Sequence, residues 1–279
     1  MLLQTLISAK ALSIKQAQEN LVMLDCRFYL TDHSKGLREY EKGHIPGAVF
    51  VDVHHELAGE VTQWTGRHPL PEVDEFADQL QRWGIDKDSQ VVVYDDMSGA
   101  VAARAWWMLS QQGIDVLVLD GGMMAWQEQG LALSIDKSLT VPSPYRFTVS
   151  FPWAVTEDSV IGNVELEVFQ LIDARANSRY QGENETIDPI AGHIPGAINR
   201  PFSDNLVASG VFKSKEVLLA EWRDLLVGGE ESVHYCGSGI TSCHNVLSMN
   251  YAGMEAKEVY VGSWSQWAKR MLRTKNMTL

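Results

Sequence analysis

The chain has 279 residues, enough for about two domains of ordinary size, and its 45% hydrophobic and 21% charged residues are typical of a globular protein. The net charge of −13 argues against nucleic acid as a partner, because an acidic protein repels the phosphate backbone. The apolar runs are much shorter than the roughly 20 residues of a membrane span, so we expect no membrane partner either.

Predicted strands and helices alternate along the chain. Short apolar runs predict strands at residues 21–24, 91–94, 116–119 and 233–235. Apolar residues at i, i+3, i+4 and i+7 predict one helical face, formed by Val73, Phe76, Ala77 and Leu80. A second helix is predicted through residues 246–249. Short strands alternating with helices predict an α/β fold, in which helices flank a mainly parallel sheet.

The second half of the chain repeats the first. Residues 43–48 and 192–197 both read Gly-His-Ile-Pro-Gly-Ala, and an Asp-X-Arg triplet precedes each copy. Further along, Val-Tyr-Asp at 93–95 corresponds to His-Tyr-Cys at 234–236. Landmarks in the same order indicate two homologous domains, because each half is long enough to bury its own core.

The join between the halves is rich in proline. Pro142, Pro144 and Pro152 lie where helical periodicity is lost, which is typical of an extended linker. We therefore expect a first domain at residues 1–135, a linker at 136–156 and a second domain at 157–279.

Cys236 opens a glycine-rich loop between a predicted strand and a predicted helix. Gly237 and Gly239 allow positive φ, so several backbone N–H groups of the loop can turn inward toward one anion. The N-terminus of the following helix adds its positive dipole end. A thiol in this setting ionises more readily, and a bound persulfide anion is stabilised by the same groups. A buried, inert cysteine is the alternative interpretation.

Cys26 ends a predicted strand and is interpreted as structural, and Cys243 lies on the helix after Cys236. Three cysteines are too few for a disulfide framework, and none forms a CxxC pair. This set fits the reducing cytosol, so a cytoplasmic location is predicted, with no metal and no organic cofactor.

These motifs resemble the tandem-domain sulfurtransferases of the rhodanese type along nearly the whole chain. The resemblance rests on the paired Gly-His-Ile-Pro-Gly-Ala motifs, on Arg-Ala-Trp-Trp at 104–107 and on Gly-Ser-Trp at 262–264. It implies that Cys236 carries the transferred sulfur as a persulfide, and that the first domain, with Asp95 at the cysteine position, is a degenerate copy. The implied acceptor is a small thiol, a protein thiol or cyanide.

The loop sequence Cys-Gly-Ser-Gly-Ile-Thr resembles the mercaptopyruvate sulfurtransferases, whereas thiosulfate-using rhodaneses tend to carry basic residues after the cysteine. Gly237, Gly239, Ile240 and Thr241 are thereby implied as donor-binding positions. An uncharged loop also lacks a cation for the thiosulfate dianion, which favours mercaptopyruvate. Thiosulfate:cyanide transfer on the same scaffold is the alternative.

The resemblance further implies catalytic roles for Ser238 and for a histidine that reaches it, assigned to His44, with Asp32 as its carboxylate partner. A structural role for His44 is the alternative, because His193 repeats it in the second half.

Arg179 resembles an arginine that binds the donor carboxylate. The related enzymes often have a second arginine about nine residues later, but residues 186–189 here read Thr-Ile-Asp-Pro. Arg200 is the suggested substitute. Arg175 belongs to the repeated Asp-X-Arg triplet, so a structural ion pair is expected for it.

Two other functions are less compatible with the loop. A cysteine-dependent phosphatase needs an arginine six residues after the cysteine, and that position is Ser242. A non-catalytic binding module does not require the cysteine that is retained at position 236.

Overall fold

The structure is a computed structural model, and it describes residues 4–183, 185–226 and 231–277. The chain forms two compact units. Unit 1 comprises Met1–Gly59, Pro71–Pro152 and Val207–Phe212. Unit 2 comprises Glu60–Leu70, Trp153–Leu206 and Lys213–Leu279. Glu60–Leu70 therefore precedes much of unit 1 in the sequence but packs within unit 2.

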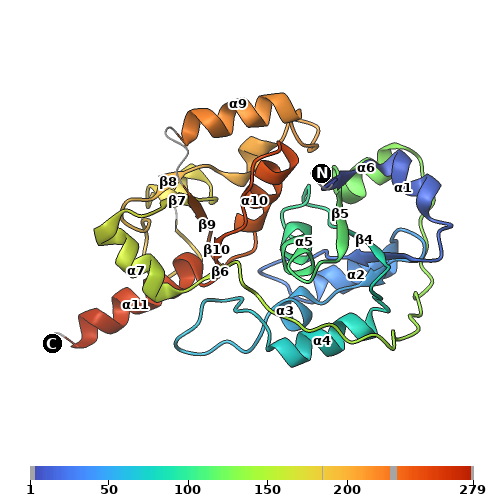
Figure 1. The fold of residues 1–279 in the computed structure, drawn as a ribbon, viewed down its shortest axis with the longest axis horizontal. Helices are drawn as coiled ribbons and strands as arrows, with labels where there is room; N and C mark the ends of the chain where they lie inside the picture. Colours follow the sequence, from blue (N-terminus) through green and yellow to red (C-terminus); the bar gives the residue numbers. More distant parts are fainter. Residues whose placement is uncertain (1–3, 184, 227–230, 278–279) are drawn as a thin grey trace. The chain divides into compact units, whose positions relative to one another are not determined.

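Unit 1 is built on a five-stranded sheet in which every pair is parallel. The strands, in spatial order, are β1 (Leu6–Ile7), β5 (Asp115–Leu119), β4 (Gln90–Tyr94), β2 (Leu21–Asp25) and β3 (Val49–Phe50). The helices are α1 (Ala9–Lys15), α2 (Lys35–Lys42), α3 (Val53–Glu56), α4 (Val73–Arg82), α5 (Ala102–Ser110) and α6 (Gly122–Glu128). They flank the sheet (Figure 1).

Unit 2 repeats this topology. Its strands, in spatial order, are β6 (Ala154–Val155), β10 (Val259–Tyr260), β9 (Ser232–Tyr235), β7 (Gln170–Asp173) and β8 (Ile198–Asn199). The α-helices are α7 (Glu157–Leu166), α8 (Asn177–Tyr180), α9 (Lys215–Leu225), α10 (Ser242–Tyr251) and α11 (Ser263–Met277), and η1 (Phe202–Asn205) is a 3₁₀ turn. The predicted α/β fold with two parallel sheets is confirmed. None of the helices in the described ranges is long and apolar enough to cross a membrane.

The central strands are apolar because helices cover both faces of a parallel sheet. Val91, Val92 and Val93 of β4 are all buried, as expected for a strand without a solvent-facing side. β4 and β9 are the central strands of their sheets. At the carboxyl end of each, the chain continues into a loop and then a helix. This position is where ligands usually bind in open α/β sheets.

The repeated Asp-X-Arg triplet makes the same buried ion pair in both units. Arg27 Nη2 lies 2.6 Å from Asp25 Oδ2 in unit 1, and Arg175 Nη2 lies 2.6 Å from Asp173 Oδ2 in unit 2. Each arginine also donates to the carbonyl oxygen of the glycine that opens the Gly-His-Ile-Pro-Gly-Ala motif. The triplet thus fastens that motif to the end of a strand in each unit.

Candidate active site

Cys236 follows the last residue of β9, and its loop is fixed by the start of α11. The Cys236 amide donates to Ser263 Oγ at 3.1 Å. In return, the amides of Trp264 and Ser265 donate to the carbonyl oxygens of Cys236 and Gly237, both at 3.0 Å. The loop is therefore held by the first turn of one helix while it leads directly into another, α10.

The sulfur of Cys236 is buried in a cradle of amide groups. The amides of Gly239 and Ser238 donate to Sγ at 3.2 and 3.5 Å. Burial raises the pKa of the thiol, but hydrogen bonds from the Thr241 hydroxyl and from Ser238 and Ser242 outweigh it. The pKa of Cys236 therefore lies below its ordinary value, which favours the thiolate, the nucleophilic form.

The structure constrains the two glycines of the loop to different degrees. Gly239 has φ +78°, and a Cβ at this position would stand 2.5 Å from the Val261 carbonyl oxygen. Gly237 does not have positive φ, so of the two glycines that allow it only Gly239 adopts it. A Cβ on Gly237 would instead stand 2.7 Å from Arg67 Nη2. Gly239 is thus required by backbone geometry, whereas a Cβ on Gly237 would meet only the far end of the Arg67 side chain, which can shift.

The corresponding loop of unit 1 holds a carboxylate where unit 2 holds a sulfur. Asp95 follows β4, and its carboxylate accepts the amides of Met97, Gly99, Val101 and Ala102 at 2.7–2.8 Å. Asp95 is completely buried. A loop at this place in the sheet thus binds an anion with backbone N–H groups alone, and in unit 1 the chain supplies the anion itself.

Segment 60–70, which we define as Glu60–Leu70, is tied to α11 in unit 2. Lys269 Nζ donates to the Thr65 carbonyl oxygen at 2.9 Å, and Gln266 Nε2 to that of Trp64 at 2.8 Å. Arg273 Nη1 donates to the carbonyl oxygen of Gln63 at 2.7 Å. These bonds use main-chain acceptors, so the segment can be recognised by α11 whatever its side chains are.

The segment brings His68 to the loop that follows Cys236. His68 Nδ1 lies 2.9 Å from Ser238 Oγ, and both side chains are buried. The sequence interpretation missed His68. Its one available signal was that His68, unlike His44, has no copy in the second half of the chain, so a role in the repeated fold could not explain it.

His44 does not have the role assigned to it. Its Nδ1 is 2.8 Å from the Tyr40 carbonyl oxygen, its Nε2 is 3.0 Å from that of Asp136, and its ring stacks on Tyr40. His193 likewise stacks on Tyr180 and contacts its carbonyl oxygen at 2.8 Å. The repeated histidines therefore hold their motifs in place, and the contact expected of His44 is made by His68.

Asp32 is not the carboxylate partner of His44, because both His44 ring nitrogens contact carbonyl oxygens. The Asp32 carboxylate is partly exposed and pairs with Arg38 at 2.6 Å, and it also accepts from Ser34. Arg38 therefore lowers the pKa of Asp32, as an opposite charge does beside an exposed acid.

Arg179 faces the loop of Cys236, whereas Arg200, suggested as the second arginine, is engaged elsewhere. Arg179 Nη1 lies 3.6 Å from the point where a Cβ of Gly237 would stand. Arg200 instead pairs with Glu221 at 2.5 Å and lies over the Trp222 ring. The second guanidinium beside Gly237 is that of Arg67, from segment 60–70.

The remaining loop residues and cysteines have simple structural settings. Ile240 is buried, and Thr241 is the N-cap residue of α10. Cys243 directs its thiol to the Gly239 carbonyl oxygen at 3.4 Å. Burial, together with Asp25, raises the pKa of Cys26, which disfavours its thiolate. All three cysteines are free thiols.

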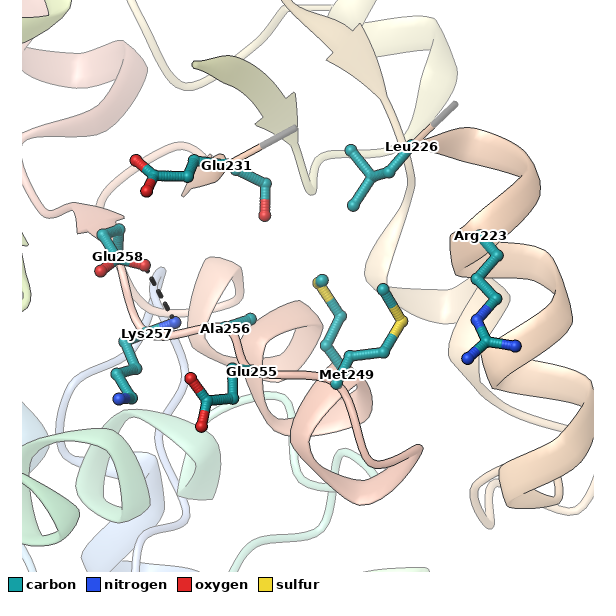
Figure 2. Close-up of a pocket in the computed structure, with 10 residues that line it drawn as sticks. Arg223, Leu226, Glu231, Met249, Glu255, Ala256, Lys257 and Glu258 are labelled. Carbon is teal, nitrogen blue, oxygen red and sulfur yellow. Dashed lines mark hydrogen bonds between the residues drawn. The ribbon is translucent and has the colours of Figure 1, made fainter. Parts of the chain in front are cut away.

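A cavity of about 570 Å³ lies at the opposite end of β9 from Cys236. Figure 2 shows Arg223, Met249 and Lys257 among its lining residues, and Ser232, the first residue of β9, also borders it. Because Cys236 follows the last residue of this strand, the cavity is separate from the sulfur of Cys236. Within the described ranges, no group of three or more His, Cys, Asp or Glu side chains is arranged to hold a metal ion.

Comparison with known proteins gives matches along nearly the whole chain. The model of the rhodanese-like domain matches residues 8–129 and again 156–270. The chain is 44% identical over 267 residues to a probable 3-mercaptopyruvate sulfurtransferase from Pseudomonas aeruginosa, covering 94% of each chain. It is 37% identical to a putative thiosulfate sulfurtransferase, SseB, from Mycobacterium tuberculosis, covering 95% of this chain and 94% of that protein.

A solved structure supports the same assignment. The 3-mercaptopyruvate sulfurtransferase from Leishmania major superposes with a TM-score of 0.87 at 29% identity, covering 99% of this chain and 76% of that one. The matches confirm the resemblance seen in the motifs and the expected enzyme class, a sulfurtransferase. The chain therefore belongs to the rhodanese-like family and contains two copies of its domain.

Proposed function

We propose that this chain transfers sulfur from 3-mercaptopyruvate to a thiol or to cyanide through a persulfide on Cys236. The observation that carries the proposal is the cradle around Cys236 Sγ, in which loop amides and hydroxyls lower the pKa of the thiol. The relatives named 3-mercaptopyruvate sulfurtransferases, at 34–44% identity, support this donor.

In the first step, the Cys236 thiolate attacks the sulfur atom of mercaptopyruvate. The new S–S bond forms as the C–S bond breaks, and the electron pair of that bond leaves on the enolate of pyruvate. The thiol proton of the donor must then move to the enolate carbon to give pyruvate. The contact between Ser238 Oγ and His68 Nδ1 supports a relay that moves this proton, which is general acid–base catalysis.

In the second step, the acceptor attacks the outer sulfur of the persulfide. The S–S bond breaks, the sulfur leaves as an acceptor persulfide or as thiocyanate, and the Cys236 thiolate is restored. The amides of Ser238 and Gly239 stabilise an anionic sulfur in both steps, as the thiolate and as the persulfide. No redox partner is consumed, because the sulfane sulfur passes on at the same oxidation level.

From the sequence, a preference for mercaptopyruvate is expected because the loop lacks a cation for thiosulfate, and the structure requires a different reason. The loop is uncharged, but Arg67 and Arg179 stand beside Gly237, so an anionic donor does not lack a cation there. The Ser238–His68 pair supplies the better argument. Pyruvate leaves as an enolate that must be protonated, whereas sulfite leaves from thiosulfate as a stable anion, so a proton relay benefits only the first donor.

Thiosulfate:cyanide transfer is the second candidate. The two guanidiniums beside Gly237 favour a dianionic donor as well as a carboxylate. Relatives named thiosulfate sulfurtransferases, at 33–37% identity, also support it. A phosphatase is disfavoured by Ser242 at the position that needs an arginine, and the lowered pKa of Cys236 argues against a purely binding module.

The test is a steady-state assay of sulfur transfer to cyanide with both donors in parallel. We expect kcat/KM for mercaptopyruvate to exceed that for thiosulfate by about tenfold or more, which corresponds to roughly 1.4 kcal/mol in activation free energy. Equal or higher kcat/KM with thiosulfate would exclude the proposed donor. A cytoplasmic location, in keeping with three free cysteines, is proposed as the setting.

A further inference from the structure

Ser265, in the first turn of α11, contacts two separate parts of the site. Its amide donates to the Gly237 carbonyl oxygen at 3.0 Å. Its hydroxyl accepts a hydrogen bond from the Arg67 amide at 3.1 Å and donates to the Gly262 carbonyl oxygen at 3.1 Å. The residue is 2% exposed, so water does not compete for these bonds. Ser265 thus connects the loop that holds Gly237 with segment 60–70.

Both contacts lie one residue away from the pair formed by His68 and Ser238. Gly237 directly precedes Ser238, and Arg67 directly precedes His68. The two bonds of Ser265 therefore hold the main chain on each side of the 2.9 Å contact between His68 Nδ1 and Ser238 Oγ. Such a contact is no longer a hydrogen bond beyond about 3.5 Å, so a small displacement of either main chain breaks it.

Gly66 allows segment 60–70 to approach Ser265 closely. A Cβ at Gly66 would stand 2.4 Å from the Gly262 carbonyl oxygen and 2.9 Å from Ser265 Oγ. A residue with a side chain therefore fits at this position only if the main chain moves. The segment is packed directly against the turn that begins α11, at the point where Ser265 bonds it.

The other bonds between α11 and the segment lie farther from the histidine along the chain. Carbonyl oxygens of residues 62–65 accept them from three long side chains, those of Gln266, Lys269 and Arg273. Long side chains retain several rotatable bonds, whereas serine carries its hydroxyl on Cβ. The bond from Ser265 is therefore both the nearest to the histidine and the one that leaves the segment least freedom.

The first half of the chain indicates that the fold itself does not need this serine. Gly-Ser-Trp-Ser at 262–265 corresponds to Gly-Gly-Met-Met at 121–124, so Met124 takes the place of Ser265 in unit 1. Met124 has no hydroxyl, and it is 47% exposed. The hydroxyl therefore accompanies the unit that holds Cys236 and is not part of the shared topology.

We propose that Ser265 is a positioning residue, whose hydroxyl holds the Arg67 amide and thereby keeps His68 within hydrogen-bond reach of Ser238. The proposal rests on the proposed function, in which this pair moves a proton to the enolate carbon. Ser265 acts through His68 rather than on the donor. Because sulfite leaves thiosulfate without a proton, the hydroxyl of Ser265 favours mercaptopyruvate alone and so determines donor preference.

A role in stability alone is the competing account, because a buried hydroxyl with two partners also stabilises the fold. Ser248 provides a matched control. Its buried Oγ accepts from Trp222 Nε1 at 3.0 Å and donates to the Asn245 carbonyl oxygen at 2.8 Å. Ser248→Ala thus removes an equivalent hydroxyl, whose two bonds join α9 and α10 instead of the loop and segment 60–70.

The experiment compares wild type with Ser265→Ala, Ser265→Thr, Gly66→Ala and Ser248→Ala. For each protein, kcat and KM are measured for sulfur transfer to cyanide from mercaptopyruvate and from thiosulfate, and the melting temperature is recorded. Ser265→Thr keeps the hydroxyl. Gly66→Ala keeps both side chains of the pair but pushes the segment away from the turn that begins α11.

We expect Ser265→Ala to lower kcat for mercaptopyruvate by roughly 10- to 100-fold, because misplacing a reacting group by about 1 Å has an effect of this size. KM for mercaptopyruvate and kcat/KM for thiosulfate should stay within about threefold of wild type, since neither depends on the proton transfer. Gly66→Ala should show the same selective loss. Ser265→Thr should recover most of the kcat that Ser265→Ala loses.

Ser248→Ala should lower the melting temperature about as much as Ser265→Ala, because both lose a buried hydroxyl with two partners. It should leave the ratio of kcat/KM for the two donors unchanged. This control separates loss of stability from loss of position.

The proposal is overturned if Ser265→Ala lowers turnover of both donors equally, or of neither. Gly66→Ala decides the question in the same way if Ser265→Ala does not fold. If wild type prefers thiosulfate, the proposed function fails, but a crystal structure of Ser265→Ala still tests the positioning. A distance from His68 Nδ1 to Ser238 Oγ beyond about 3.5 Å supports the proposal, and an unchanged contact overturns it.

Discussion

His68 Nδ1 lies 2.9 Å from Ser238 Oγ although 170 positions separate the two residues in the sequence. The contact exists because Glu60–Leu70 packs in the same compact unit as the catalytic loop. Three side chains of α11 hold the main chain of this segment, and the same helix begins by binding the carbonyl oxygens of Cys236 and Gly237. One helix thus contacts both the loop of Cys236 and the segment that carries His68.

Replacing His68 by glutamine should lower kcat for mercaptopyruvate by about 100-fold, the usual effect of losing a general acid–base group. The thiosulfate reaction should fall much less, because sulfite leaves without a proton. His44→Gln is the matched control, since His44 is buried and both its ring nitrogens contact carbonyl oxygens. It should lower the melting temperature while kcat stays within about threefold. Equal losses for the two donors in the His68 variant would contradict the relay.

The reactive thiol should ionise at lower pH than an ordinary cysteine. Loop hydrogen bonds lower the pKa of Cys236, so the thiolate persists as pH falls, and the rate of alkylation by iodoacetamide should reach its plateau at a lower pH than for a free thiol. Thr241→Val removes a hydroxyl that stabilises the thiolate and should move the midpoint to higher pH. Peptide mapping should find Cys26 unmodified at neutral pH, because burial raises its pKa.

A midpoint that does not respond to Thr241→Val would show that the loop hydroxyl is not what lowers the pKa of Cys236. Alkylation of Cys26 ahead of Cys236 would contradict the assignment of the reactive thiol itself.

Gly239→Ala should abolish sulfur transfer. A left-handed φ costs a residue with a Cβ roughly 1 kcal/mol, and at Gly239 this Cβ also meets the Val261 carbonyl oxygen. Gly196→Ala is the matched control, because Gly196 has φ +79° but nothing within 4 Å of its Cβ position. The Gly196 variant should lose about 1 kcal/mol of stability and keep full kcat/KM. Comparable activity of the two variants would show that sulfur transfer tolerates a displacement of the main chain at Gly239.

Asp95→Ala should destabilise the protein without removing its activity. Four buried amides lose their acceptor, so we expect the free energy of unfolding to fall by about 3 kcal/mol, as measured by denaturant titration. Because Asp95 lies in unit 1, donor treatment should still place one sulfur on Cys236. An unchanged free energy of unfolding would mean that the carboxylate is not needed to satisfy this loop.

Cys236 alone should carry the labile sulfur. Intact mass after treatment with mercaptopyruvate should rise by one sulfur atom, located by digestion on the peptide that contains Cys236. Cys236→Ser should abolish both the mass increase and turnover, whereas Cys243→Ser, which removes a thiol bonded to the Gly239 carbonyl oxygen, should retain both. Sulfur found on Cys26 or Cys243 in the wild type would refute the mechanism.

Local patterns determined the parts of this protein that depend on neighbours in the sequence. A strand that ends at Cys236, glycines after it and a helix beyond them predicted an anion cradle, because backbone amides close to one another in sequence form it. Internal repetition predicted two copies of one fold, and the duplicated triplet predicted a structural ion pair for Arg175, which it makes with Asp173. Each of these follows from short-range geometry that the residue types largely dictate.

Only the tertiary structure decided which distant side chains meet the reactive sulfur. His68 and Arg67 reach the loop because side chains of α11 donate hydrogen bonds to main-chain carbonyl oxygens of segment 60–70. Every residue type has such a carbonyl oxygen, so these contacts cannot be predicted from the sequence of the segment. The catalytic role predicted for His44 was wrong for the same reason. Its motif stands out in the sequence, but both ring nitrogens contact carbonyl oxygens of Tyr40 and Asp136 and so hold the fold. A motif identifies residues that the fold repeats, whereas contacts across 170 positions depend on the path of the chain.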